Sequence, residues 1–241
     1  MRLVLSLALA LLAGRVSAEP VRLDYFELPP YSYEQDGNAQ GSAFPVATAI
    51  IGGLDVVALP NHVPLRRVNF EADKTPFLLA AIVRTAEREN RFQWIGRLCT
   101  DPFFIATRAP NPPIDTLEQA RKLKSIAVMA GASNEAFLRG HGFTNIDPAS
   151  SLPLEVRRVA EGHDDGWFAF KSGALYEWKR AGYDPSELRF GAPIAPMTIW
   201  FAASLAVPEE LVATLRSRFA EKVKDGTVAA ATGCVDRGAP E

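Results

Sequence analysis

Two adjoining stretches decide the fold: residues 77–83 (FLLAAIV) and residues 84–96 (RTAERENRFQWIG). Seven consecutive apolar residues predict a strand that is buried on both faces of a parallel sheet. The charged stretch begins where this strand ends, and open α/β sheets bind ligands at the carboxyl ends of their strands. Most charged runs are solvated loops. The position of residues 84–96, rather than their charge alone, makes them a candidate ligand site.

Strand and helix patterns alternate along the rest of the chain. The other predicted strands cover residues 21–26, 55–59, 92–95, 103–107, 125–129, 166–170 and 197–204. The predicted helices cover residues 43–51, 115–122, 134–140, 154–161, 173–181 and 208–223. Residues 35–38 (QDGN) predict a tight turn. This alternation predicts the α/β class with mainly parallel sheets.

The composition excludes several classes of protein. Of 241 residues, 22% are charged and 48% hydrophobic, which excludes a disordered chain and a multi-span membrane protein. The formal charge of -2 gives no basic field to attract nucleic acid. Two cysteines are too few for a disulfide scaffold or a four-cysteine zinc site, and the three histidines lack metal-ligand spacing. We therefore predict no metal, no cofactor and no nucleic-acid partner.

The first eighteen residues have the pattern of a secretory signal peptide. Arg2 precedes an eleven-residue apolar run (residues 3–13), and small residues end the segment at Ala18. Eleven residues are too few for a membrane-spanning helix, which needs about 20, so we expect export and cleavage after Ala18. In an oxidising compartment, Cys99 and Cys234 would more often pair than remain free. The sequence leaves open whether they meet.

Residues 84–96 resemble the R-T-P-E-R-x-x-x-F-x-W-x-G segment of family 3 extracellular solute-binding proteins, the periplasmic proteins that bind polar amino acids. Further stretches resemble that family in the expected order. They are residues 25–41 (opening strand and hairpin), 115–142, 161–168 (EGHDDGWF, like "xGrvDawf") and 199–211 (final crossover strand and helix). Together these stretches span nearly the whole mature chain.

The resemblance implies the two-lobed periplasmic binding protein fold (type II), in which each lobe is a mainly parallel sheet flanked by helices. We expect residues 19–106 and 196–241 to form the first lobe and residues 107–195 the second. The crossovers should lie near residues 104–110 and 193–200. The ligand would sit between the lobes and be buried by hinge closure.

The implied function is capture of a small carboxylate-bearing solute, with a polar amino acid as the first candidate. A monomer in the periplasm would deliver this solute to an ABC-type permease in the inner membrane. Two alternatives stay open. One is a periplasmic enzyme of the same fold, similar to a prephenate or arogenate dehydratase, which needs an acidic proton donor in the cleft opposite Arg88. The other is a ligand-sensing protein that docks on a receptor.

The resemblance also implies the ligand-binding residues, and we predict no catalytic ones. Arg88 matches the arginine that grips the ligand carboxylate, a role that suits a planar guanidinium. The alternative for Arg88 is a surface salt bridge with Glu87 or Glu89. Thr85 would add a hydroxyl donor beside it.

Three more residues complete the implied site. Ser133 follows Gly131 and Ala132 between a strand and a helix, where we expect it to cap the helix and to donate to an anion. Phe26 and Tyr31 lie near the end of the first strand and would stack on the ligand.

One departure from the family concerns the second lobe. Phe170 stands where amino-acid binders carry the aspartate that pairs with the ligand ammonium. Asp164 or Glu177 are possible substitutes. A ligand without an α-amino group therefore stays open.

Overall fold

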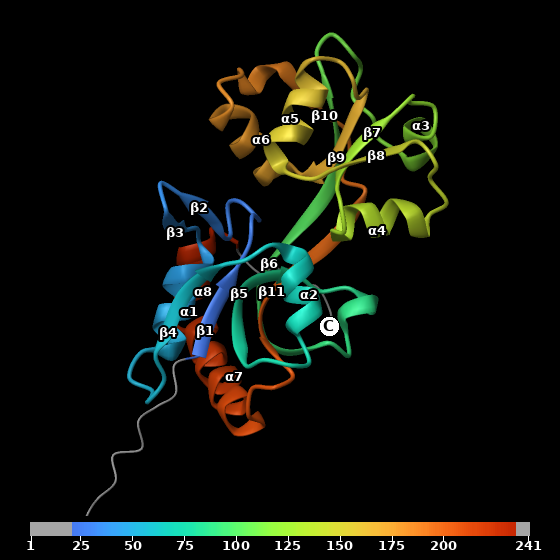
Figure 1. The fold of residues 1–241 in the computed structure, drawn as a ribbon. Helices are drawn as coiled ribbons and strands as arrows, with labels where there is room; N and C mark the ends of the chain where they lie inside the picture. Colours follow the sequence, from blue (N-terminus) through green and yellow to red (C-terminus); the bar gives the residue numbers. More distant parts are fainter. Residues whose placement is uncertain (1–20, 235–241) are drawn as a thin grey trace, which may run out of the picture.

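The protein consists of two lobes joined by two long strands, β6 (Phe92–Arg108) and β11 (Ala195–Ser204), as Figure 1 shows. This computed structural model describes residues 21–234, so the predicted signal peptide lies outside the described residues. None of the helices in residues 21–234 is long and apolar enough to cross a membrane.

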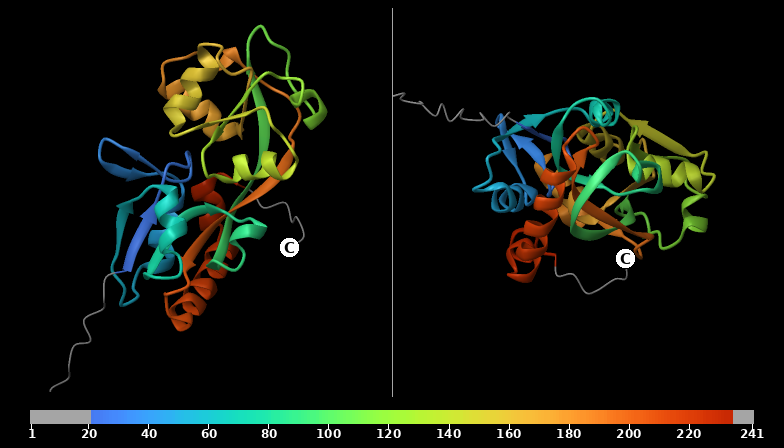
Figure 2. Two further views of the ribbon diagram at one scale, coloured as in Figure 1. Left: turned by 45° about the vertical axis from the view of Figure 1, so that its right-hand side comes forward. Right: turned by 90° about the horizontal axis from the view of Figure 1, so that it is seen from below.

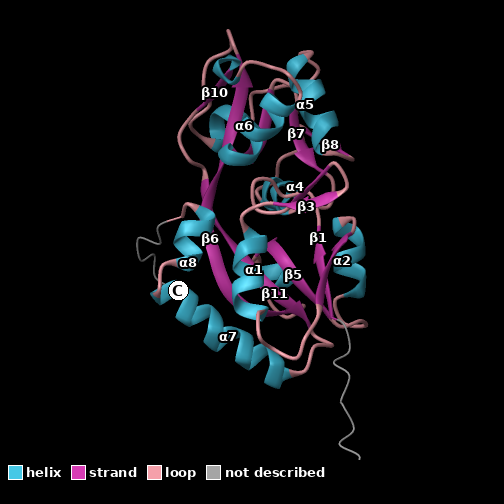
Figure 3. Ribbon diagram, turned by 90° about the vertical axis from the view of Figure 1, so that its left-hand side faces the viewer, coloured by secondary structure: helices cyan, strands magenta, loops and turns pink. Residues whose placement is uncertain are grey.

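The first lobe is built around β5 (Phe77–Val83), in which every residue is buried, as the apolar run predicts. The strands β1 and β4 continue the sheet in parallel on one side of β5, and β11 pairs with its other side. The bounds are β1 (Val21–Tyr25), β4 (Ala58–His62), and the hairpin strands β2 (Tyr33–Gln35) and β3 (Asn38–Gln40). The helices are α1 (Ala43–Ile51), α2 (Leu65–Glu71), α7 (Glu209–Lys224) and α8 (Thr227–Thr232). Figure 3 shows α7 along the outer side of this lobe, beyond α1 and β6.

The second lobe is a smaller sheet with helices around it. Its strands are β7 (Ile126–Met129), β8 (Ile146–Ala149), β9 (Gly166–Phe170) and β10 (Leu188–Phe190). Its helices are α3 (Leu117–Ala120), α4 (Ser133–Gly140), α5 (Leu152–Ala160) and α6 (Lys171–Arg180). Two 3₁₀ turns, η1 (Ala86–Arg88) in the first lobe and η2 (Pro185–Glu187) in the second, complete the described elements.

One sheet runs through both lobes in the order β4-β1-β5-β11-β6-β9-β7-β8, with β10 beside β6. The pairs β4–β1, β1–β5, β9–β7 and β7–β8 are parallel. Each antiparallel pair of this sheet includes β6 or β11, because the chain leaves the first lobe along β6 and returns along β11. The predicted two-lobed α/β fold is confirmed. The residue boundaries of the lobes stay a prediction, since these two strands belong to both.

Most predicted elements lie where the sequence placed them, but β6 does not break where we expected it to. The sequence predicted separate strands at residues 92–95 and 103–107, because Gly96 and Pro102 normally interrupt a strand. In the structure Pro102 lies opposite Pro196 of β11. A side chain at Gly96 would collide with the ring of Phe219, so this glycine lets α7 pack closely on the strand. The second strand also lies later than predicted, at β4 rather than at residues 55–59.

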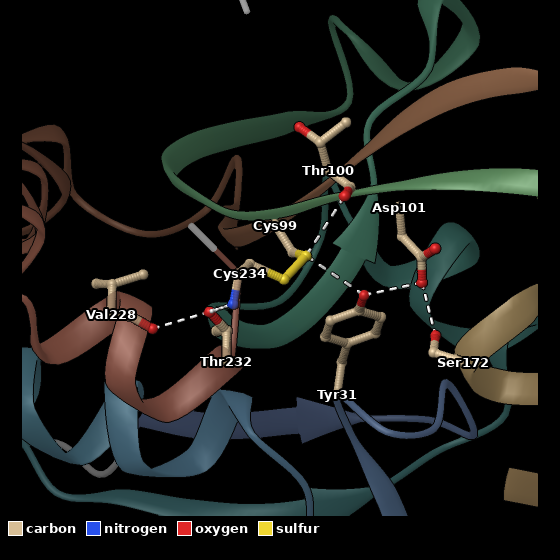
Figure 4. The surroundings of a disulfide bond; sticks show 8 residues. All are labelled: Tyr31, Cys99, Thr100, Asp101, Ser172, Val228, Thr232 and Cys234. Carbon is tan, nitrogen blue, oxygen red and sulfur yellow. Dashed lines mark hydrogen bonds between the residues drawn. A yellow bond between two sulfur atoms is a disulfide. The ribbon is translucent and has the colours of Figure 1, made fainter. Parts of the chain in front are cut away.

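A disulfide joins Cys99 of β6 to Cys234, which follows α8 (Figure 4). The Cα atoms are 5.5 Å apart and the two cysteines are 135 positions apart in the chain. The pairing that the sequence left open is therefore present. It ties the last described helix to the strand that crosses between the lobes.

We predict that the double variant Cys99→Ala/Cys234→Ala folds but loses about 2–4 kcal/mol of unfolding free energy, because the cross-link no longer restricts the unfolded chain. Urea unfolding of the wild type and the variant measures the difference. Reductant should lower the stability of the wild type and leave the variant unchanged. Two titratable thiols in denatured, unreduced wild type would contradict the disulfide.

Candidate functional site

A cavity of about 720 Å³ lies between the two lobes. Its lining includes a residue at or directly after the carboxyl end of every strand in the two parallel sets. These residues are Phe26 after β1, Val63 after β4 and Val83 of β5 in the first lobe, with Met129 of β7, Ser150 after β8 and Phe170 of β9 in the second. Both lobes thus point their parallel strands at one cavity, which is where α/β sheets bind ligands.

Arg88 lies at the end of η1, one turn beyond the buried strand β5. The turn closes where the backbone N–H of Arg88 donates to the carbonyl oxygen of Thr85, at 2.9 Å. The side chain folds back, and Nη1 donates to the carbonyl oxygen of Val83 at 3.1 Å. This arrangement leaves Arg88 only 7% exposed while it lines the cavity.

Arg88 is a buried cation with no carboxylate partner among residues 21–234. Burial lowers its pKa to about 10, which Glu87 opposes and Arg91 reinforces, so the guanidinium stays charged at neutral pH. The alternative salt bridge with Glu89 does not form, because Arg84 donates to that carboxylate at 2.8 Å. The charge of Arg88 is therefore available to a ligand.

Thr85 and Ser133 lie beside Arg88 from opposite lobes. A smaller hollow of about 310 Å³ adjoins the cavity, and Thr85 lines this hollow, whereas Arg88 and Ser133 line both. The expectation that Ser133 caps its helix is wrong: Ala132 is the N-cap, Ser133 is the first helical residue, and no side chain caps the helix. The hydroxyl of Ser133 is therefore not used for capping.

Part of the predicted anion site at the start of α4 is filled by the protein itself. Glu135 accepts a hydrogen bond from the backbone N–H of Gly131 at 2.6 Å and pairs with Arg139 at 2.7 Å. One of the loop N–H groups thus already has a carboxylate. The ligand donors that remain on this side are Ser133 and Arg88.

The two aromatic residues predicted to stack on the ligand lie in different places. Phe26 lines the cavity, as expected. Tyr31 does not line the cavity: it is buried in the core of the first lobe, where its hydroxyl donates to Asp101 Oδ2 at 2.9 Å (Figure 4). The same Asp101 oxygen accepts from Ser172 at 2.6 Å. We therefore leave Tyr31 out of the candidate site.

Sequence analysis missed Glu155, a carboxyl that lines the cavity from α5 and is 1% exposed. Burial raises its pKa to about 8, Glu177 and Asp164 add to the rise, and Trp167 and Arg158 oppose it. Asp164 and Glu177, the substitutes that the sequence suggested, do not line the cavity. The missed signal is an acid on the apolar stripe of a helix, between Leu152 and Val156.

The other charged groups of the cavity are partly neutralised. Glu27 lies 3.3 Å from His62 and 3.9 Å from Arg180. Arg66 adds a further guanidinium to the wall. Phe170, at the position where amino-acid binders carry an aspartate, stacks on Phe103 with a centroid separation of 4.3 Å. Within residues 21–234, no group of three or more His, Cys, Asp or Glu side chains is placed to hold a metal ion.

Comparison with known proteins supports the architecture. No protein-family model matches the chain, and no curated protein matches it either. A histidine kinase sensor domain with similarity to periplasmic binding proteins aligns with a TM-score of 0.80 at 17% identity, over 90% of this chain and 96% of that one. The chain has the periplasmic binding protein fold.

Two amino-acid-binding proteins show the same fold. An ancestral arginine-binding protein bound to arginine aligns with a TM-score of 0.77 at 16% identity, over 89% of this chain and 97% of that one. An ABC uptake transporter substrate-binding protein from Streptococcus pneumoniae with bound histidine aligns with a TM-score of 0.73 at 14% identity, over 87% and 90%. Identities this low establish the architecture and leave the ligand to be argued from the cavity.

The position of Tyr31 gives a prediction that separates stability from ligand binding. Tyr31→Phe removes the hydroxyl that donates to Asp101, and we expect a loss of about 1–3 kcal/mol of unfolding free energy because a buried acceptor loses its partner. Urea unfolding measures this loss. Ligand affinity, measured by calorimetry once a ligand is found, should change by less than about threefold. A loss of affinity as large as that of an Arg88 variant would return Tyr31 to the site.

Proposed function

We propose that the protein captures a small carboxylate-bearing solute in the cavity between its lobes. The observation that carries this proposal is the buried guanidinium of Arg88, which lines the cavity and has no carboxylate partner within residues 21–234. A buried charge is costly unless it is paired. A ligand carboxylate supplies the missing partner, and the planar fork of arginine suits it.

Both lobes would hold this carboxylate. Arg88 approaches from the first lobe and Ser133 from the second, and they line the cavity together. Thr85, in the adjoining hollow, adds a hydroxyl on the first-lobe side. A ligand held by donors from both lobes favours the closed arrangement, since it binds that arrangement better than the open one.

We further propose that the protein is a family 3 solute-binding protein that acts as a periplasmic monomer and delivers its ligand to an ABC-type permease. The sequence resemblance supports this assignment, and so do solved structures of ABC transporter substrate-binding proteins with the same fold. The arginine and histidine bound by such proteins make polar amino acids the first class of ligand to screen.

One observation favours a second candidate, an enzyme of the same fold. Glu155 is the acidic group in the cavity that a dehydratase similar to those acting on prephenate would need as a proton donor. Incubation with prephenate tests this candidate. Formation of phenylpyruvate in proportion to protein, and its absence with Glu155→Gln, would support the enzyme. No turnover with tight binding would leave the binding protein.

Arg88→Ala should weaken ligand binding by about 30-fold to several thousand-fold, because a carboxylate removed from water would lose its charged partner, at a cost of about 2–5 kcal/mol. Arg88→Lys should restore binding only in part, since an ammonium lacks the planar fork. Calorimetry measures both, with the ligand identified by a thermal-shift screen of amino acids, polyamines and small organic acids.

Arg91→Ala is the matched control. Arg91 follows η1 and lines only the smaller hollow, so its loss should change affinity for the same ligand by less than about fivefold. Circular dichroism should show that all three variants fold. An affinity unchanged by Arg88→Ala would remove Arg88 as the carboxylate anchor and with it the basis of the proposed function.

A further inference from the structure

We propose that Glu155 is the ligand-contacting polar group of the second lobe, and that it acts as a neutral carboxyl that donates a hydrogen bond to a ligand oxygen. The ligand would then be an organic acid, such as a 2-oxo acid, without an ammonium group. This inference rests on the proposed function and names the class of ligand that the same cavity would select.

The geometry places Glu155 and Arg88 on opposite lobes of one cavity. Arg88 enters from η1 and Glu155 from α5, and both line the cavity while almost fully buried. Oε1 of Glu155 has no hydrogen-bond partner among the described residues. A polar atom left buried without a partner costs free energy, so a ligand atom that pairs with Oε1 gains from the contact.

The surroundings of Glu155 keep its carboxyl neutral. Burial raises its pKa to about 8, and the carboxyl groups of Glu177 on α6 and Asp164 before β9 raise it further. The indole of Trp167 on β9 and the charge of Arg158, on the same helix as Glu155, oppose the rise. Arg158 is engaged by Asp147 at 2.8 Å, and Trp167 Nε1 makes no hydrogen bond with the described residues.

The rest of the cavity also disfavours an ammonium group. Glu27, the other carboxylate of the wall, already faces His62 and Arg180. Arg66, Arg88 and Arg180 give the wall more positive than negative groups while Glu155 is neutral. An ammonium placed there would meet like charges and find no unpaired carboxylate. An anion with an oxygen acceptor at its second end meets donors at both ends.

The apolar side chains indicate the body of the ligand. Phe26 lies on the first-lobe wall, and Phe170 and Leu152 lie on the second-lobe wall. These walls suit an aromatic or branched aliphatic group between the two polar ends. The probes are therefore matched pairs that differ only in the amino group: L-phenylalanine with phenylpyruvate, and L-leucine with 4-methyl-2-oxopentanoate.

Calorimetry with these pairs at pH 6.5 and pH 9 tests the proposal. The oxo acid should bind at least tenfold more tightly than its amino acid at pH 6.5. Its affinity should fall by about tenfold by pH 9, because a group with a pKa of about 8 is then mostly ionised. Glu155→Gln keeps a neutral donor, so it should bind the oxo acid within about threefold of the wild type at pH 6.5 and lose most of the pH dependence.

Stability without ligand gives an independent readout. The folded state keeps the Glu155 proton between the ordinary pKa of 4.5 and about 8, whereas the unfolded chain loses it. Stability from this group is therefore complete below the lower value and falls as pH rises through the window. Urea unfolding should show a smaller fall from pH 5 to pH 8 for Glu155→Gln than for the wild type. Glu210→Gln, an exposed carboxyl on α7, is the matched control and should follow the wild type.

The opposite results would overturn the proposal. Tighter binding of the amino acids, together with a loss of more than tenfold in Glu155→Gln, would show that Glu155 is an ionised partner of an ammonium. That outcome leaves the proposed function intact as long as Arg88→Ala also abolishes binding. Equal, pH-independent oxo-acid binding by the wild type and Glu155→Ala would remove Glu155 from the site. No binding of any probe or of any solute in the thermal-shift screen would remove the proposed function itself.

Discussion

The antiparallel ladder between β6 and β11 is the constraint on which the rest of the structure depends. It runs from the pair Phe92–Ser204 to the pair Phe103–Ala195, with register shifts beside Trp200 and Ala202. The ladder carries the parallel strands of the first lobe on the β11 side and those of the second lobe on the β6 side. The carboxyl ends of both sets consequently face one cavity, as the views in Figures 1 and 2 allow the reader to follow.

The two lobes also touch away from the ladder, along α6. Asp101 of β6 accepts from Ser172 at the start of α6 and from Tyr31 of the first lobe. Further along the helix, Tyr176 packs on Tyr33 with ring centroids 4.8 Å apart. A side chain at Gly173 would meet the carbonyl oxygen of Pro29 at 2.9 Å. These contacts hold one side of the cavity together, so closure would swing the opposite side, where α4 faces η1.

The sequence predicted the parts of the fold that local pattern determines. Seven apolar residues in a row suffice to place β5, and the residues that follow it must then lie at the carboxyl end of the sheet. For this reason Arg88 could be placed in the cleft from sequence. Tyr31 could not be placed, because its hydroxyl is fixed by Asp101, which is 70 residues away in the chain. Long-range pairing likewise decides the continuity of β6 and the disulfide.

Glu155 shows why the site itself was only half predictable. Its helix has an ordinary amphipathic pattern, and an acid on the apolar stripe becomes meaningful only when the structure shows a cavity in front of it. The resemblance to amino-acid binders directed attention to the position of Phe170 and to nearby acids, which in fact lie behind the cavity wall. A single sequence indicates which residues are polar, but it does not show which polar residues share a cavity.

Arg88 and Glu155 solve the problem of a buried ionisable group in opposite ways. A carboxyl can avoid the cost of a buried charge by keeping its proton, and burial shifts the pKa of Glu155 in that direction. An arginine cannot do so at neutral pH, since even the lowered pKa of Arg88, about 10, leaves it charged. The free energy of the empty cavity therefore contains an unpaired positive charge and no compensating negative one. A ligand relieves this cost most when it brings a carboxylate to Arg88 without bringing a second positive charge, so the same balance that gives affinity also gives selectivity.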